Sequence, residues 1–330
     1  MFKTCLHIGF HKTASTYLQK YVFSKHPQIN YLGKFEKELK TINSGKNYLI
    51  EFDQLLFKLF NYKLENIDQN FTFDKIIEPK ENKLNVVSEE RISSFFYYKD
   101  QNAKYIFKKL KYIFQSNNDF KIVLLIRNQK DLLISRYSEN FKLFCDINPN
   151  WKIFKNFAKD ITEEKLSSLE KHILDNYKYY DFIINLQNFL PKDKIGIFIY
   201  EDLRNNPKLF FKNFFNFLEI DNIELENAKE YYSLVYKGFY ENKKNFFSSH
   251  RVNETNLTRF KKFINIPKNL LKIVKYFVII FVSYPNYIYQ IFTNPISKSK
   301  TYKKNVEKYY KNDNKKLSQL LGRNLEDLGY

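Results

Sequence analysis

The segment GFHKTAST, residues 9–16, places a lysine among small and hydroxylated residues near the start of the chain. It follows a short apolar run and precedes a helical pattern, so a turn from strand to helix is expected there. At such a turn the first N–H groups of the helix and the positive end of its dipole bind phosphate or a related oxyanion. The side chain of Lys12 adds a positive charge that can follow an oxygen atom through a reaction. The alternative is that Lys12 lies on an exposed helix start, with its Ser and Thr neighbours acting only as caps.

This segment differs from the nucleotide-binding sequence GxxxxGK[ST] of kinases and ATPases. Only Phe10 and His11 separate Gly9 from Lys12, and no glycine directly precedes the lysine. A loop this short is not expected to wrap the β- and γ-phosphates of a triphosphate.

A second cationic residue, Arg127, ends the apolar run IVLLIR. Nucleotide triphosphatases often place a magnesium-binding aspartate at this point. Asn128 can cap the next helix, and Ser135 lies two turns along it. Because a guanidinium group bonds two phosphate oxygens at once, Arg127 with Ser135 could hold a second phosphate. The two anion sites together predict a ligand with phosphate at two positions.

Four apolar runs rich in β-branched residues are expected to form the strands that position these groups: 3–9, 83–88, 120–127 and 194–200. Helical patterns separate them, at about 14–25, 103–115, 129–144, 161–190 and 207–218. Consecutive apolar positions indicate burial on both faces of the sheet. We therefore predict an α/β fold, a mostly parallel sheet flanked by helices, with its ligand at the carboxyl ends of the strands.

The C-terminal part of the chain reads as helical, with a polar break around 237–256. We predict an α/β domain over 1–258 and a helical, basic extension over 259–330. The lysines near the end are interpreted as a solvated helix face, with lipid or polyanion contact as the alternative. The uncharged stretch 276–297 contains a dense apolar part of nine residues, YFVIIFVSY, whereas a membrane span needs about 20. A buried helix is favoured there over an interfacial one.

The composition gives a formal net charge of +19, from 55 Lys and Arg against 36 Asp and Glu. This surplus favours anionic partners: nucleic acid, a charged membrane surface, or a phosphorylated or sulfated small molecule. An A/T-rich coding sequence would give the same lysine-rich profile, so charge alone decides little.

Cysteine usage and the N-terminal segment bear on the compartment. Cys5 and Cys145 form no metal-binding or disulfide pattern, which predicts a reducing compartment and no structural metal. Charge returns at Lys12 with no room for a signal-peptide core before it, so the mature protein is expected to start here. We expect a cytoplasmic protein, with membrane association through the basic C-terminus as the alternative.

Three blocks, each at the end of a predicted strand, resemble the sulfotransferases that use 3′-phosphoadenosine 5′-phosphosulfate (PAPS). HIGFHKTASTYLQ is similar to the family's 5′-phosphosulfate loop, especially in its bacterial and glycan-modifying branches, and IRNQKDLLISRYSENF is similar to its 3′-phosphate segment. YEDLRNNPKLFFKNFFNFLEID resembles the segment whose tyrosine lies by the adenine. The resemblance covers most of residues 3–221 and weakens afterwards. It implies a P-loop-like sulfotransferase fold and PAPS as the sulfuryl donor, with no metal.

The resemblance also implies roles for individual residues. Lys12 would neutralise charge on the leaving oxygen and, like the rest of the loop, would bind the cofactor. The remaining implied cofactor ligands are the amides of Thr13 and Ala14, the hydroxyls of Ser15 and Thr16, Arg127 with Ser135, Tyr200 by the adenine, and Arg251 closing the 3′-phosphate site. Many family members have glycine where Ala14 stands. If this position needed a positive φ the alanine would cost stability, and a helical first turn would remove that cost.

The general base is expected after another strand, in NVVSEERIS. Related sulfotransferases often carry a carboxylate near this place, so Glu90 is nominated, with Glu89 as second choice. The alternative is that both acids are exposed residues favoured at a helix start. His11 is the rival base, or it only shapes the loop. The other histidines form no recognisable group with functional residues: His7, His26, His172 and His250.

The resemblance implies a sulfotransferase acting on a hydroxyl of a carbohydrate or glycolipid, and no nucleic-acid partner is expected. One alternative is a nucleotide-dependent small-molecule kinase, which would need a glycine-rich loop and a metal-binding carboxylate. The other is a non-enzymatic basic protein that binds a polyanion or a membrane, with affinity falling steeply as salt rises.

Overall fold

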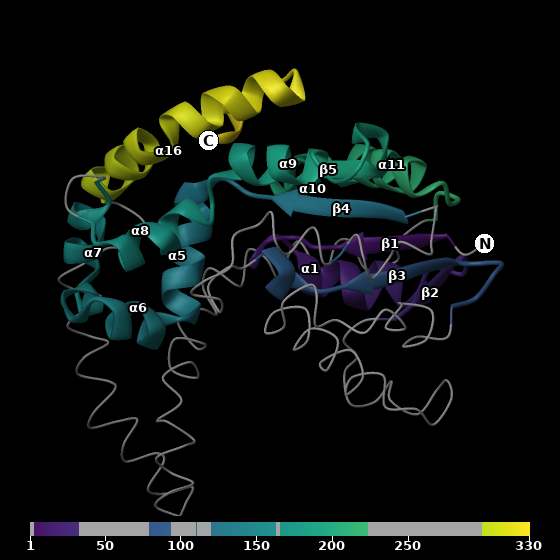
Figure 1. Ribbon diagram of the computed structural model, residues 1–330, viewed down its shortest axis with the longest axis horizontal. Coiled ribbons are helices and arrows are strands. Elements are labelled where there is room, and N and C mark those ends of the chain that lie inside the picture. Colours follow the sequence, from purple (N-terminus) through teal and green to yellow (C-terminus); the bar gives the residue numbers. More distant parts are fainter. Residues whose placement is uncertain (1–2, 33–78, 94–109, 111–119, 163–165, 224–298) are drawn as a thin grey trace, which may run out of the picture. The chain divides into compact units, whose positions relative to one another are not determined.

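The computed structural model describes residues 3–32, 79–93, 110, 120–162, 166–223 and 299–330 (Figure 1). The chain divides into two compact units. The first comprises Met1–Gln129, His172–Lys229 and Lys311–Tyr330, and the second comprises Lys130–Lys171 and Glu230–Tyr310.

The first unit is built on a five-stranded sheet with the order β2-β3-β1-β4-β5, in which every neighbouring pair is parallel. The strands are β1 (Thr4–His7), β2 (Ile29–Tyr31), β3 (Leu84–Ser88), β4 (Phe120–Ile126) and β5 (Ile195–Ile199). All residues of β1, β3 and β4 are buried, as expected for a parallel sheet covered on both faces. The four predicted strands and the parallel α/β class are confirmed, and the short β2 was not predicted.

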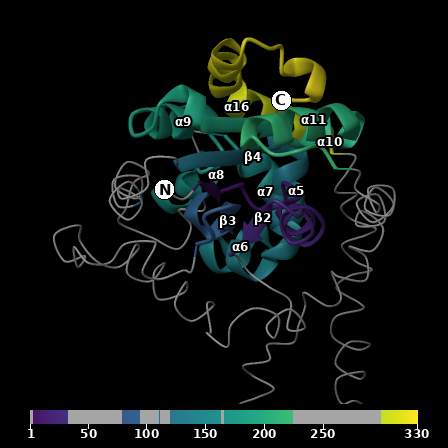
Figure 2. The same ribbon diagram turned by 90° about the vertical axis from the view of Figure 1, so that its right-hand side faces the viewer.

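Helices cover both sides of this sheet. They are α1 (Ser15–Tyr17), which continues into the π-helical segment η1 (Leu18–Phe23), α9 (Tyr179–Gln187), α10 (Tyr200–Asn205) and α11 (Pro207–Leu218). Figure 2, which looks along the strands, shows α9 on one side of the sheet and α11 on the other. The α1–η1 segment packs on α11, because Tyr17 lies 6.1 Å from Phe211 and Phe23 lies 6.1 Å from Phe214 between ring centroids.

The predicted helical patterns are recovered with some divisions. The pattern at 207–218 coincides with α11, whereas 129–144 covers α5 (Gln129–Glu139) and the first four residues of α6 (Phe141–Ile147). The pattern at 161–190 contains α8 (Ser168–Asp175) and α9. The predicted helix at 103–115 lies almost wholly outside the described residues.

The second unit has an aromatic core. Its described helices include α5 beyond its first residue, α6, the short 3₁₀ turn η6 (Pro149–Lys152), α7 (Phe154–Asp160) and the first half of α16 (Lys300–Leu321). Tyr137 stacks on Phe157 at 5.1 Å between centroids, and its hydroxyl donates to the carbonyl oxygen of Trp151 at 2.6 Å. Trp151 and Tyr302 are both fully buried in this unit.

The C-terminal residues do not form a unit of their own where they are described. Lys311–Tyr330, the second half of α16 and the segment after it, belongs to the same unit as the sheet. The predicted boundary between residues 258 and 259 and the uncharged stretch 276–297 both lie outside the described residues. Within the described part, no helix combines the length and apolar character needed to cross a membrane.

The strand register brings the candidate residues to one edge of the sheet. His7 of β1 is level with Ser88 of β3 and Val123 of β4, and Ile126 is level with Ile199 of β5. The segments that follow these four parallel strands therefore emerge at the same edge. Since β1 is central, the loop after it is flanked by the segments after β3 and β4.

Candidate active site

The loop after β1 has an unusual backbone. Lys12 and Ala14 both lie in the left-handed region, with φ of 67° and 69°. The expectation that a helical first turn spares Ala14 is therefore wrong: the alanine occupies a conformation that costs a non-glycine residue roughly 1–2 kcal/mol. Gly9 is required for a different reason, since a Cβ atom there would lie 2.8 Å from Nε2 of His7.

The carbonyl group of Lys12, within the left-handed turn, accepts a hydrogen bond from Arg127. Nη1 of Arg127 donates to the carbonyl oxygen of Lys12 at 3.0 Å. The guanidinium carbon lies 4.5 Å from the ring centroid of Tyr200, the first residue of α10. The two cationic residues predicted at neighbouring strand ends therefore meet at the same loop, and Tyr200 joins them there.

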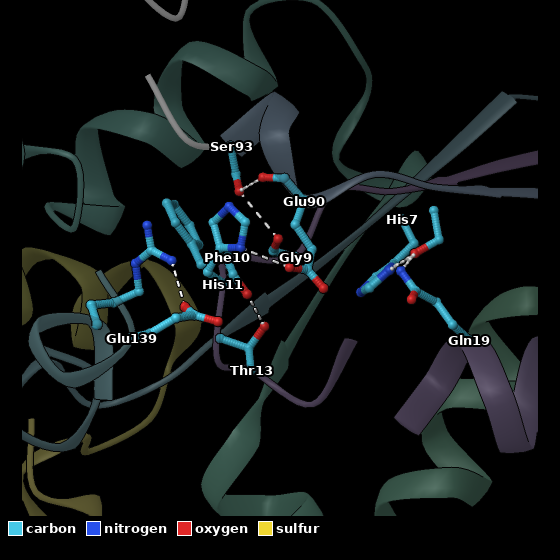
Figure 3. A network of polar contacts seen from close by, with 11 residues as sticks. His7, Gly9, Phe10, His11, Thr13, Gln19, Glu90, Ser93 and Glu139 are labelled. Atoms are coloured by element: carbon cyan, nitrogen blue, oxygen red, sulfur yellow. Dashed lines mark hydrogen bonds and ion pairs between the residues drawn. The ribbon is translucent and has the colours of Figure 1, made fainter. Parts of the chain in front are cut away.

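Two buried donors at this place have no partner among the described residues. One is Oγ of Ser15, which is 2% exposed, and the other is Nε of Arg127. The hydroxyl of Thr13 has a different use, because it donates to the carbonyl oxygen of Phe10 within the loop (Figure 3). Thr16 is exposed. Unpaired buried donors cost free energy unless an acceptor arrives, so they fit an oxyanion ligand.

The carboxylate of Glu90 and the imidazole of His11 contact each other, with 2.8 Å between Oε2 and Nδ1 (Figure 3). Their side chains are 16% and 17% exposed, and Nε2 of His11 has no partner among the described residues. Glu90 begins a short 3₁₀ turn, η4 (Glu90–Ser93), and Oγ of Ser93 lies 3.1 Å from the carbonyl oxygen of Gly9. Glu89 is fully buried, so the first choice of carboxylate is the one better placed to act beside the loop.

A second polar group was not predicted from the sequence: His7, Ser88 and Gln19. Nδ1 of His7 lies 2.7 Å from Oγ of Ser88, and the side-chain amide of Gln19 donates to the same oxygen at 2.9 Å (Figure 3). Burial lowers the pKa of His7 to about 4, against the opposing charge of Glu90, so the imidazole is neutral at physiological pH. The prediction that His7 belongs to no group of polar side chains is wrong. Its partner Ser88 was missed because the two residues are brought together only by the pairing of β1 with β3.

The remaining predicted ligands have these positions. Ser135 lies on α5 in the second unit, so its pairing with Arg127 stays a prediction. Arg251 lies outside the described residues. Among the described residues, no group of three or more His, Cys, Asp or Glu side chains is arranged to hold a metal ion.

A solved structure of low sequence identity shares the fold. A sulfotransferase from Alicyclobacillus acidocaldarius aligns over 100% of both chains, with a TM-score of 0.50 and 10% identity. The sulfotransferase domain from the curacin biosynthetic pathway matches with a TM-score of 0.39 and 13% identity, over 68% of this chain and 76% of that one. No curated protein matches the sequence significantly.

The comparison with protein families gives a match over most of the chain. Residues 4–266 match the family described as the sulfotransferase domain, a range that includes β1 to β5 and the segments that follow them. This range also holds Lys12, Glu90, Arg127 and Tyr200. The chain belongs to the sulfotransferase domain family.

Proposed function

We propose that this sulfotransferase moves a sulfuryl group from PAPS to a hydroxyl group of a carbohydrate or glycolipid. The observation that carries the proposal is the contact of the Arg127 guanidinium with the carbonyl oxygen of Lys12. It brings Arg127, at the end of β4, to the loop that carries Lys12 after the adjacent strand β1, which suits a donor with a 5′-phosphosulfate and a 3′-phosphate. The acceptor class rests on the resemblance of the loop to the glycan-modifying branch. Membership of the family favours this reading over a kinase or a non-enzymatic polyanion-binding protein.

The donor fits the unpaired groups of the loop. The 5′-phosphosulfate would accept from the amides of Thr13 and Ala14 and from the hydroxyls of Ser15 and Thr16. The buried Oγ of Ser15 would gain the acceptor that the described residues do not supply. Nε of Arg127 would likewise bond a 3′-phosphate oxygen, while the ring of Tyr200 stays against the guanidinium and beside the adenine.

Lys12 would act on the bond that breaks. As the acceptor oxygen attacks sulfur, the bond from sulfur to the 5′-phosphate oxygen breaks and negative charge grows on that oxygen. An ammonium group there stabilises the transition state more than the ground state, and its loss typically costs on the order of 10²–10³ in turnover.

The acceptor's proton would go to the His11–Glu90 pair. If Nδ1–H of His11 donates a hydrogen bond to Oε2 of Glu90, the lone pair of Nε2 is available to take the proton of the acceptor hydroxyl. Glu90 then orients the imidazole and stabilises its charged form. This arrangement gives both nominated bases a role, and such catalysis contributes about 10²–10⁴-fold.

A thermal-shift titration with 3′-phosphoadenosine 5′-phosphate tests the donor site. The nucleotide should raise the melting temperature of the wild type, and it should raise it less in Lys12→Ala and Arg127→Ala. Lys25→Ala and Arg204→Ala remove the same charges from exposed positions and should respond like the wild type. A larger response to ATP with magnesium would support a kinase, and indifference to both nucleotides would refute the donor assignment.

Radiolabelled PAPS and a panel of sugars and glycolipids test the acceptor. Label should appear on a hydroxyl of a carbohydrate, and transfer only to non-carbohydrate alcohols would contradict that class. For the base, His11→Asn and Glu90→Gln should both lower kcat and leave the KM for PAPS unchanged, with the larger loss in His11→Asn. A larger loss in Glu90→Gln would show that Glu90 itself is the base.

A further inference from the structure

A chain of hydrogen bonds joins Arg127 to the C-terminal segment of the protein. The hydroxyl of Tyr179 donates to the carbonyl oxygen of Arg127 at 2.7 Å. The next residue, Asn128, donates to Oε1 of Glu201 from its backbone N–H at 3.2 Å and its side-chain amide at 2.8 Å. The hydroxyl of Tyr330 donates to the other carboxylate oxygen, Oε2, at 3.2 Å. All five residues belong to the first unit.

The carboxylate at the centre of this chain is a costly group to bury. Glu201 is 0% exposed, and burial raises its pKa, so its oxygens depend on the donors that surround them. The hydroxyl of Tyr330 therefore stabilises the buried carboxylate, because without it Oε2 would lose that donor. Both terminal nitrogens of Arg323 donate hydrogen bonds to the carboxylate of the adjacent Asp202. The C-terminal segment therefore contacts α10 at two residues, Glu201 and Asp202.

These contacts fix Arg127 from several directions. Its own carbonyl group is held by Tyr179, and the N–H that follows it is held by Glu201. Its side chain rests against the ring of Tyr200. Because Tyr200 and Glu201 are the first two residues of α10, a displacement of this helix would move the ring and the backbone anchor together.

We propose that residues Arg323–Tyr330 form part of the donor site, with Tyr330 and Glu201 acting as positioning residues for Arg127 and Tyr200. The inference rests on the proposed function, because it takes Arg127 and Tyr200 as ligands of the donor nucleotide. The C-terminal segment is then a structural element of the α/β unit.

The kinetic consequence is specific. Arg127 and Tyr200 would hold the nucleotide equally in the ground state and in the transition state, so loosening them weakens donor binding without slowing the chemical step. Tyr330→Phe removes one hydroxyl group and keeps the ring. It should raise the KM for PAPS about 3- to 10-fold, which corresponds to the net contribution of one ordinary hydrogen bond, and leave kcat unchanged at saturating donor.

Three further variants make the test sharper. Tyr302→Phe also removes a buried hydroxyl from the C-terminal region, one that donates to the carbonyl oxygen of Lys130 in the second unit. It should leave the KM for PAPS unchanged. Glu201→Gln keeps an acceptor for Asn128 and removes the buried charge, so adding Tyr330→Phe to it should raise KM less than in the wild type.

The experiment measures KM and kcat for PAPS in the four variants, with the melting-temperature response to 3′-phosphoadenosine 5′-phosphate as a second readout. If the wild type does not respond to the nucleotide, the proposed function fails. If the wild type responds and Tyr330→Phe has the same KM and response, the positioning role is refuted. An equal rise in KM in Tyr302→Phe would also refute it, because general loosening would then explain the effect.

Discussion

The neutral, buried His7 should make the first unit sensitive to acid. Burial lowers the pKa of this imidazole from 6.5 to about 4. Between these pH values the unfolded chain binds a proton at His7 and the folded protein does not. Its contribution to stability is complete above pH 6.5 and is lost as the pH falls from 6.5 toward 4. The full loss is about 3 kcal/mol, and the part lost by pH 5 is about 2 kcal/mol.

Urea unfolding followed by circular dichroism at pH 8 and pH 5 measures this loss. In His7→Asn, the amide can still bond Oγ of Ser88 and carries no titrating group. The variant's stability at pH 8 is expected to fall because it packs less well, but the difference between the two pH values should shrink by about 2 kcal/mol. His172→Asn, at a half-exposed position on α8, removes a histidine outside this cluster and should behave like the wild type.

The comparison refutes the reasoning if the wild type and His7→Asn lose the same stability between pH 8 and pH 5. That result would mean that His7 takes up its proton inside the fold. Fluorescence of Trp151, the single tryptophan, reports the second unit and should show no His7-dependent change in its own transition.

Three further properties of the protein can be tested by substitution or chemical modification. Ala14→Gly should raise the free energy of unfolding by about 0.5–1 kcal/mol in urea titrations, because it relieves a left-handed alanine, whereas the control Ala158→Gly, within helix α7, should lower it. Burial raises the pKa of Asp313 to about 6, so its ionisation costs stability as the pH rises from 3.8 to 6. Asp313→Asn should therefore gain about 2 kcal/mol over the wild type between pH 4 and pH 7.5, and an equal response of both proteins would contradict this. Burial raises the pKa of Cys5 to about 12, so at pH 8 Ellman's reagent should modify Cys145 quickly and Cys5 only after denaturation.

The parts of this fold that could be predicted are those with a local signal. The longest strand, β4, contains five consecutive apolar residues, Ile122–Ile126, because burial on both faces replaces the polar–apolar alternation of a half-buried strand. The strand β2, Ile29–Tyr31, has only three residues, with an asparagine in the middle, and forms because it pairs with β3. A pairing of this kind is decided by the neighbouring strand and leaves no periodicity to read.

The same distinction separates the site residues. Lys12, Glu90 and Arg127 could be nominated because each follows a strand directly, and the carboxyl edge of a parallel sheet is where ligands bind. The contacts of His7 with Ser88 and of Glu201 with Tyr330 join residues 81 and 129 positions apart in the chain. Each depends on tertiary packing, and a buried polar residue looks the same in a sequence whether its partner is water or a distant side chain.

The geometry of Arg127 explains how two anion sites can act as one. Its Nη1 atom is committed to the carbonyl oxygen of Lys12, so the guanidinium stabilises the left-handed turn that shapes the 5′-phosphosulfate loop. Its Nε atom is buried without an acceptor among the described residues. An anion that bonds Nε would fix the guanidinium, and the fixed guanidinium would hold the loop, so occupation of one site favours occupation of the other.

Arg127→Lys, with no planar fork, cannot make both contacts, and it should weaken binding of 3′-phosphoadenosine 5′-phosphate more than binding of adenosine 5′-phosphate, which lacks the 3′-phosphate. Equal weakening of both nucleotides in a calorimetric titration would show that Arg127 serves the loop alone.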